Sequence, residues 1–159
     1  MPNAIVTATP ATLELDELGS IPADWVVGNK IETRSKMLSG TRDWTANIVV
    51  WECGAGSYKW HYNQDEFIIV ISGGGFMTND KGEERWFGPG DVAFFPAGTN
   101  ANWRHPDHFR KVAVLKESMW RPLGFAVKVW KKLVRTVLNG KSPLMLLLAG
   151  LITASVGYL

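Results

Sequence analysis

The sequence contains one cysteine, Cys53, in 159 residues. An intrachain disulfide is therefore excluded, and one thiol with three scattered histidines does not make a zinc-finger pattern. Two of those histidines, His105 and His108, lie in a polar loop and are predicted to be surface residues. The first twenty residues lack the basic stretch and apolar run of a secretory signal, so we expect a cytoplasmic protein. In that reducing setting, Cys53 is expected to be a packed thiol rather than a nucleophile.

Acidic residues are missing from the last 39 positions. The first 120 residues carry all 15 acids and 11 of the 17 basic residues, a net charge of −4, whereas residues 121–159 carry six basic residues and no acid. The negative charge of the first part argues against nucleic acid as a partner. Two regions with different partners are therefore predicted.

Short runs of β-branched and aromatic residues, separated by clusters of Gly, Pro, Asn and Asp, follow one another over residues 44–117. This pattern predicts an all-β barrel over 44–117, after an irregular lead-in over 1–43. In the lead-in we expect a short helical turn near residues 12–18 and an extended piece near 30–38. The strands predicted in the barrel are 47–52, 57–62, 66–72, 75–78, 84–87, 91–95, 101–104 and 110–115.

The pattern changes after Lys116. Over residues 124–138, apolar residues recur at three- and four-residue spacing with lysines and arginines between them, which predicts a basic amphipathic helix. Residues 142–159 then run for 18 residues without a charge, close to the lower limit for a transmembrane helix. We expect region 121–159 to contact inner-membrane lipid or a membrane protein, with the barrel at the cytoplasmic face. The alternative is a soluble cytoplasmic protein whose C-terminal helix packs on the barrel or on a second subunit.

Two stretches of the barrel carry a recognisable spacing. One runs from Gly56 to Gly73 and includes Glu66, and the other is Gly90-Asp-Val-Ala-Phe-Phe-Pro96-Ala-Gly98. They resemble the two motifs of the cupin superfamily: HxH, three or four residues, Glu, six residues, Gly; then Gly, five residues, Pro, any residue, Gly, two residues, His. The resemblance implies a small RmlC-like jelly-roll barrel.

A finer resemblance rests on the string Trp51-Glu52-Cys53-Gly-Ala-Gly56, on Trp103 shortly after the second motif and on Arg110-Lys111 in the last strand. These features are similar to the subfamily of ureidoglycine aminohydrolase and ethanolamine-utilisation cupins. Because related small cupins are often dimeric, the resemblance also implies a homodimer.

In metal-binding cupins, the histidines and the glutamate of the motifs hold Mn, Fe, Ni or Zn. The matching positions here, taken with four residues before the glutamate, are Lys59, His61, Glu66 and Ala101. Only His61 and Glu66 could be metal ligands, and a protonated Lys59 would repel a divalent ion. No cofactor is therefore expected, and a metal would have only these two protein ligands.

Because alternate residues of a strand share a face, Lys59, His61 and Glu66 are predicted to converge inside the barrel with Trp103. The neighbours expected around them are Trp51, Ile68 and Phe94. One interpretation is a binding site for a small polar or anionic ligand. The other is a buried ion pair of Lys59 and Glu66 that the fold retains, with His61 hydrogen-bonded beside it.

Three functions remain open from the sequence. The first is a binding module for a small-molecule ligand, tethered to the membrane by its C-terminal region. The second is an enzyme resembling the ureidoglycine aminohydrolase cupins, which would act on a small nitrogenous or carboxylated metabolite with His61 or Glu66 as the acid–base group. The third is a structural subunit whose barrel is a docking domain. A shared fold does not separate the three, because one fold hosts many functions.

Overall fold

The computed structural model describes residues 5–118 and 121–138. Its elements are β1 (Glu17–Ser20), β2 (Val26–Val27), β3 (Glu32–Gly40), β4 (Ala46–Cys53), β5 (Gly56–His61), β6 (Asp65–Gly73), β7 (Gly75–Asn79), β8 (Glu84–Phe87), β9 (Val92–Phe95), β10 (Asn100–His105), β11 (Phe109–Lys116) and α1 (Arg121–Leu138). The chain divides into two compact units, Met1–Ser118 and Met119–Leu159.

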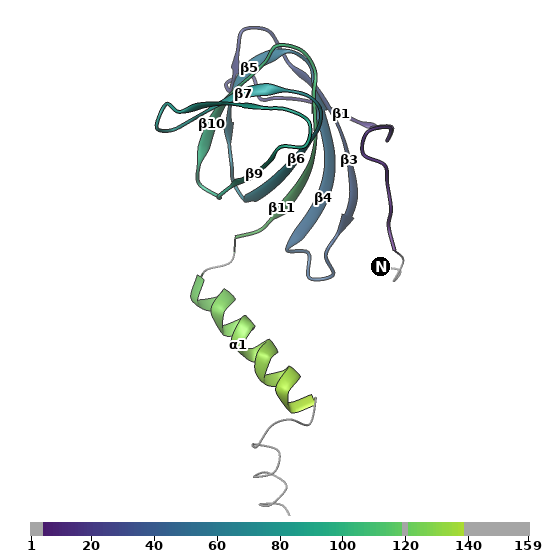
Figure 1. Cartoon of the computed structure of the whole chain (residues 1–159), viewed down its shortest axis with the longest axis vertical. Helices are drawn as coiled ribbons and strands as arrows, with labels where there is room; N and C mark the ends of the chain where they lie inside the picture. The colour runs from purple at the N-terminus through teal and green to yellow at the C-terminus, as the bar shows by residue number, and fades with distance from the viewer. Residues whose placement is uncertain (1–4, 119–120, 139–159) are drawn as a thin grey trace, which may run out of the picture. The chain divides into compact units, whose positions relative to one another are not determined.

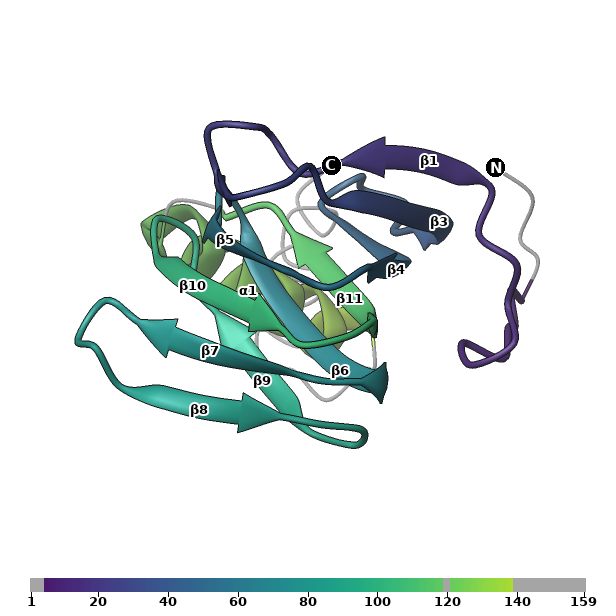
Figure 2. The ribbon, with the colours of Figure 1, turned by 90° about the horizontal axis from the view of Figure 1, so that it is seen from above.

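The strands of the first unit form two antiparallel sheets, which face each other across a common core (Figures 1 and 2). One sheet has the order β1-β3-β4-β11-β6-β9 and the other the order β2-β5-β10-β7-β8. All eight strands predicted from the barrel pattern are present, and each of their ends lies within one residue of its expected position. The mostly β fold predicted from the sequence is thus confirmed.

The lead-in contributes three strands to these sheets. Its predicted extended piece near 30–38 is strand β3, which pairs with β4. The helical turn predicted near 12–18 lies earlier in the chain: the N–H groups of Thr12 and Leu13 donate to the Thr9 carbonyl, whereas Glu17–Ser20 pairs with β3 as strand β1. Long-range pairing with the sheet overrides the local helical preference of this acidic segment.

Turn residues explain why the strands end where they do. In the connection from β7 to β8, the Asn79 side-chain oxygen accepts hydrogen bonds from the backbone N–H groups of Lys81 and Glu83, both at 3.0 Å. Gly82 takes a φ of 80°, a left-handed conformation that costs glycine little. This side-chain-capped turn is the tight connection that the Asn-Asp-Lys-Gly sequence predicts.

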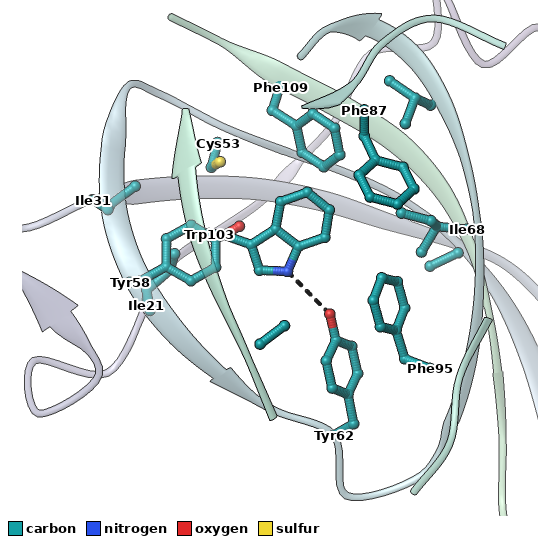
Figure 3. Packing of buried hydrophobic residues seen from close by; sticks show 13 residues of the cluster. Ile21, Ile31, Cys53, Tyr58, Tyr62, Ile68, Phe87, Phe95, Trp103 and Phe109 are labelled. Atoms are coloured by element: carbon teal, nitrogen blue, oxygen red, sulfur yellow. Dashed lines mark hydrogen bonds between the residues drawn. The ribbon is translucent and has the colours of Figure 1, made fainter. Parts of the chain in front are cut away.

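Aromatic side chains fill the space between the sheets. Trp103 lies in the centre of this core, with its ring 5.6 Å from that of Phe87 and 5.5 Å from that of Phe109 (Figure 3). Its indole N–H donates to the Tyr62 hydroxyl at 3.0 Å. Burial raises the pKa of Tyr62, so this hydroxyl stays protonated. Trp103 is therefore a core residue with its one polar group already satisfied.

Arg110 attaches the N-terminal segment to the sheet. Its guanidinium donates to the backbone carbonyl of Pro10 at 2.9 Å and to that of Leu13, and it pairs with Glu52 at 2.8 Å. Because Glu52 lies opposite Arg110 on the neighbouring strand β4, the carboxylate holds the guanidinium in place. The lead-in is thus anchored by one partly buried cation.

Helix α1 is the amphipathic helix predicted over 124–138, extended by three residues at its start. Pro122 suits the first turn of a helix, where a missing N–H costs nothing, and Arg135 in the last turn interacts favourably with the helix dipole. Within the described ranges, no helix is long and apolar enough to cross a membrane. The uncharged run 142–159, predicted to be a transmembrane helix, lies outside those ranges.

His105 is a core residue, and the prediction that it lies at the surface is wrong. Its ring is 2% exposed, because His105 follows Ala101 and Trp103 along the inward face of β10. Nδ1 donates to the Gly74 carbonyl at 3.0 Å, and Nε2 accepts from the Tyr58 hydroxyl at 2.9 Å. Both nitrogens of a neutral imidazole are thereby satisfied. Burial lowers the pKa of His105 to about 4.

This buried imidazole predicts a loss of stability in weak acid. Unfolded histidine titrates near pH 6.5, whereas folded His105 stays neutral down to about pH 4, so the unfolded state binds more protons between these values. The free energy of unfolding should therefore fall by about 3 kcal/mol as pH drops from 6.5 to 4. Urea titrations of the wild type, His105→Gln and the exposed-site control His108→Gln measure this slope. An NMR-titrated His105 pKa at or above 6.5 would contradict the prediction.

Candidate functional site

The two faces of strand β5 determine which side chains enter the barrel. In the pairing with β10, Tyr58 lies opposite Trp103 and Trp60 lies opposite Ala101. Cross-strand neighbours share a face, and both Trp103 and Ala101 are buried, so Tyr58 and Trp60 face the interior. Lys59 lies opposite Asn102, and both are exposed. Lys59 therefore points away from the barrel interior.

His61 also lies on the face opposite to Trp60. Its Nδ1 is 2.5 Å from the side-chain oxygen of Asn100, its cross-strand neighbour, and its ring contacts that of Trp25 at 4.7 Å. Of the four residues predicted to converge, only Glu66 and Trp103 are buried between the sheets. The predicted convergence of Lys59 and His61 with them is wrong. Of the two residues considered as the acid–base group of an enzyme, Glu66 faces the interior and His61 does not.

The number of residues between the HxH part of the motif and Glu66 explains why Lys59 and His61 were placed on the wrong face. The motif allows three or four residues before the glutamate, and four places Lys59 and His61 at the ligand positions. With three, the positions are occupied by Trp60 and Tyr62, which are the residues that face inward with Glu66. Because the side-chain period of a strand is two, a slip of one residue exchanges the faces of the whole strand.

The charged group that does meet Glu66 is Lys111. Its Nζ lies 2.5 Å from Glu66 Oε1, and the two side chains are 11% and 5% exposed. Glu66 comes from β6 and Lys111 from the adjacent strand β11. The pairing of these strands shifts register between Arg110 and Lys111, so that Lys111 lies opposite the inward-facing Val70. The extra residue at this bulge, Ile71, belongs to β6, so β11 keeps its regular alternation and Lys111 faces inward like Phe109 and Ala113.

Indole rings surround the Lys111 ammonium. Nζ lies 5.0 Å from the ring centroid of Trp51 and 5.8 Å from that of Trp60, both within cation–π range. Trp25 packs edge-on against Trp60 at 5.4 Å. Trp51 and Trp60 are half-buried, so solvent partly reaches this charged and aromatic cluster. Ile68 also faces inward, as predicted, and is 1% exposed.

We call Lys111, Glu66, Trp51 and Trp60 the ion-pair site. Glu66 and Trp51 are predicted inside the barrel from the sequence, whereas Lys111 is not among the predicted site residues. The available signal was the alternation of β11, in which Phe109, Lys111 and Ala113 occupy the same phase. Phe109 and Ala113 are both buried, so Lys111 lies on an apolar, inward face of the strand. A charged residue at such a position is unusual and marks a candidate site residue.

The residues at the ligand positions do not fit the divalent metal that cupin motifs can hold. These positions contain Trp60, Tyr62, Glu66 and Ala101, of which only Tyr62 and Glu66 have oxygen donors. The Tyr62 hydroxyl accepts the Trp103 N–H and stays protonated, and Glu66 is paired with an ammonium. Across residues 5–118 and 121–138, no three His, Cys, Asp or Glu side chains are grouped so that they could hold an ion. The site is not that of a metal cupin.

Cys53 supplies no nucleophile at this end of the barrel. It is 4% exposed, and burial raises the pKa of its thiol to about 12. The thiolate is therefore a negligible fraction near neutral pH. This agrees with the packed thiol predicted from the sequence.

Comparison with known proteins identifies the barrel. Residues 40–113 match the model of the EutQ-like cupin domain family. No match was found among curated proteins. Many solved structures are similar, among them a Pseudomonas syringae pv. tomato protein of unknown function from the DUF861 family, with 18% identity and a TM-score of 0.62. The match covers 67% of this chain and only 46% of that protein, so this chain corresponds to less than half of it.

Two further structures are similar to the chain. A cupin-like protein from Thermotoga maritima has 17% identity and a TM-score of 0.53, with 67% of this chain and 80% of that chain covered. The EutQ protein of Clostridium difficile has 24% identity and a TM-score of 0.48, with 57% of this chain and 71% of that chain covered. At these identities the likeness concerns the fold alone. The match over residues 40–113 and the two-sheet architecture together establish that this chain contains a cupin domain of the EutQ-like family.

Proposed function

We propose that this protein is a binding module whose cupin barrel takes up the anionic group of a small polar ligand at the ion-pair site, and which is held at a membrane by its C-terminal region. The observation that carries the first part is the Lys111–Glu66 pair, buried to 11% and 5% exposure between two indoles.

A buried ion pair is a poor source of stability. The cost of removing both charges from water is of the same order as their attraction, so an apolar pair of similar volume stabilises a fold at least as well. The rest of the interior is packed with aromatic and aliphatic side chains that need no charge. A charged pair in such a core is better explained by a ligand than by folding energetics.

The chemistry of the ion-pair site selects the ligand class. The Lys111 ammonium can exchange the Glu66 carboxylate for an anionic group of a ligand, and the half-buried indoles of Trp51 and Trp60 offer flat apolar surfaces for the rest of it. A ligand that carries only a positive charge would be repelled by Lys111. A small carboxylate or a similar anion is therefore the favoured class.

The membrane part of the proposal rests on helix α1. At 3.6 residues per turn, Lys128, Lys131, Lys132 and Arg135 fall within an arc of about 100°, opposite exposed apolar side chains. Such a helix lies in the interface of an anionic membrane, with its basic face on the headgroups. Basic residues beside an apolar run stay on the cytoplasmic side, which would place the barrel there.

The homodimer implied by the resemblance stays a prediction. One surface suited to it is the outer face of β6 and β9, where Phe67, Ile69 and Phe94 are exposed. Phe67 stacks on Phe94 at 4.5 Å, so Phe94 lies on this outer face and the prediction that it neighbours Glu66 inside the barrel is wrong. Exposed apolar patches of this kind mark interaction surfaces.

The energetics of the ion pair can be measured with a double-mutant cycle. Lys111→Met leaves Glu66 buried without a partner and should lower the free energy of unfolding by about 3 kcal/mol. Glu66→Leu combined with Lys111→Met should recover most of this loss, because neither residue then carries a charge. Lys59→Met, on the exposed face, is the matched control and should change stability by less than about 0.5 kcal/mol. A single-variant loss as small as that of the control would contradict a buried pair.

Ligand uptake can be followed through the indole N–H signals of Trp51 and Trp60 in NMR spectra, with acetate as the anionic probe and methylammonium as the cationic one. Acetate at millimolar concentration should shift both signals in the wild type and in Lys59→Met. The folded Glu66→Leu/Lys111→Met variant should show no shift. The proposal fails if acetate leaves both signals unmoved, if methylammonium alone shifts them, or if Lys59→Met abolishes the response.

The membrane part is tested with the full-length chain and sedimented vesicles. The protein should bind phosphatidylglycerol vesicles more tightly than phosphatidylcholine vesicles, with a preference that weakens in high salt. Replacing Lys128, Lys131, Lys132 and Arg135 by glutamine should remove about 1 kcal/mol of binding per residue on the anionic vesicles. Equal binding to both lipids, or no binding to either, would contradict the electrostatic part of the tether.

A further inference from the structure

The turn between β3 and β4 holds a tryptophan in an unfavourable conformation. Trp44 has a φ of 59°, and it is the non-glycine residue with positive φ in the described part of the chain. Bulky side chains are rare in this left-handed region, where Asn, Asp or Gly would be accommodated with less strain. Its side chain is also 74% exposed. Neither burial nor backbone preference therefore explains the presence of an indole here.

A network centred on Asp43 fixes this strained turn. The Asp43 carboxylate accepts hydrogen bonds from the Thr41 hydroxyl at 2.6 Å, from the Thr45 hydroxyl at 2.9 Å and from the Thr45 N–H at 3.3 Å. The bond from Thr41 contributes most to lowering the pKa of Asp43, to about 2, so the network persists at physiological pH. A rigid turn that holds its tryptophan in solvent is pre-organised to present that side chain to a partner.

The turn lies where the chain leaves the barrel. The Glu117 N–H donates to the Thr45 carbonyl at 2.7 Å, and Lys116 pairs with Ala46 at the end of β11. Figure 1 shows the β3–β4 turn and the end of β11 at the same end of the barrel. The segment that carries the basic helix therefore begins beside Trp44. A surface that binds helix α1 is therefore connected to the barrel through this end, because only residues 117–120 separate β11 from α1.

Other apolar groups are exposed around the turn. Met37 and Ile48 are exposed on the adjoining strands, and Ile48 and Val114 line a shallow groove of about 200 Å³ with residues of the turn. The exit end of the barrel thus combines a protruding indole with a small apolar surface.

We propose that Trp44 inserts into the interfacial layer of the membrane and so orients the barrel with its chain-exit end toward the lipid. This inference rests on the proposed membrane tether and adds to it the face that the barrel presents. Tryptophan suits this position because its ring is apolar while its N–H can remain hydrogen-bonded, and it is enriched at membrane–water interfaces. The strain at Trp44 then serves membrane contact rather than folding.

The test uses the full-length protein on vesicles of equal parts phosphatidylglycerol and phosphatidylcholine, with and without bromine on the acyl chains. Bromine quenches the fluorescence of tryptophans that reach the lipid. We compare the wild type with Trp44→Asn, which removes the indole and accepts the left-handed backbone. Trp86→Ser is the matched control, because Trp86 is also exposed but lies on β8, the edge strand of the other sheet.

We expect bromine to quench less of the tryptophan fluorescence in Trp44→Asn than in the wild type, because the indole that reaches the lipid is gone. The urea midpoint of Trp44→Asn should be equal to or higher than that of the wild type. Trp86→Ser should be quenched like the wild type. Three outcomes overturn the inference. The first is unchanged quenching in Trp44→Asn on vesicles that the protein does bind. The second is a lower urea midpoint of Trp44→Asn, which would make the indole structural, and the third is a changed mass of this variant in sedimentation equilibrium, which would assign Trp44 to a contact between copies. Failure of the wild type to bind vesicles would instead refute the tether itself.

Discussion

The pairing of strands β5 and β10 is the constraint on which the rest of the barrel depends. It places Tyr58 and Trp60 against buried residues of β10 and leaves Lys59 opposite an exposed asparagine. Once this register is set, Trp60 and Tyr62 face inward with Glu66 at the motif positions, and the side chains of Lys59 and His61 lie on the other face. The cation that pairs with Glu66 is therefore Lys111 and not Lys59. Lys111 reaches Glu66 from β11, and the two form a buried ion pair.

Local signals made the fold predictable, whereas the site depended on long-range pairing. The eight barrel strands could be located because Gly, Pro, Asn and Asp mark their ends, and the Asn79 turn illustrates how such residues act. The face of each β5 residue could not be read in the same way, because the motif permits two spacings and these give opposite faces. Lys111 was missed for a related reason: it lies 45 residues from Glu66 in the chain, and only the pairing of β6 with β11 brings the two side chains together.

His105 shows the same limit in the core. A histidine in a polar run between Arg104 and Pro106 reads as a surface residue, yet it occupies the inward phase of β10 and is satisfied by Tyr58 and Gly74. Trp44 is the reverse case, an aromatic residue that the fold leaves in solvent at a backbone cost. For His105 the type of residue alone gave the wrong expectation, and its position along the paired strand β10 explains its buried environment.

Lys111, and not Lys59, lies inside the barrel, and the accessibility of the two amines tests this placement most directly. Brief acylation of the folded protein, with the extent of labelling at each lysine measured by mass spectrometry, compares the two in one sample. The structure predicts that Lys59 labels at the rate of an exposed lysine and that Lys111 labels more than about tenfold more slowly, because Glu66 and the two indoles shield its amine. Equal rates, or a protected Lys59, would contradict the account.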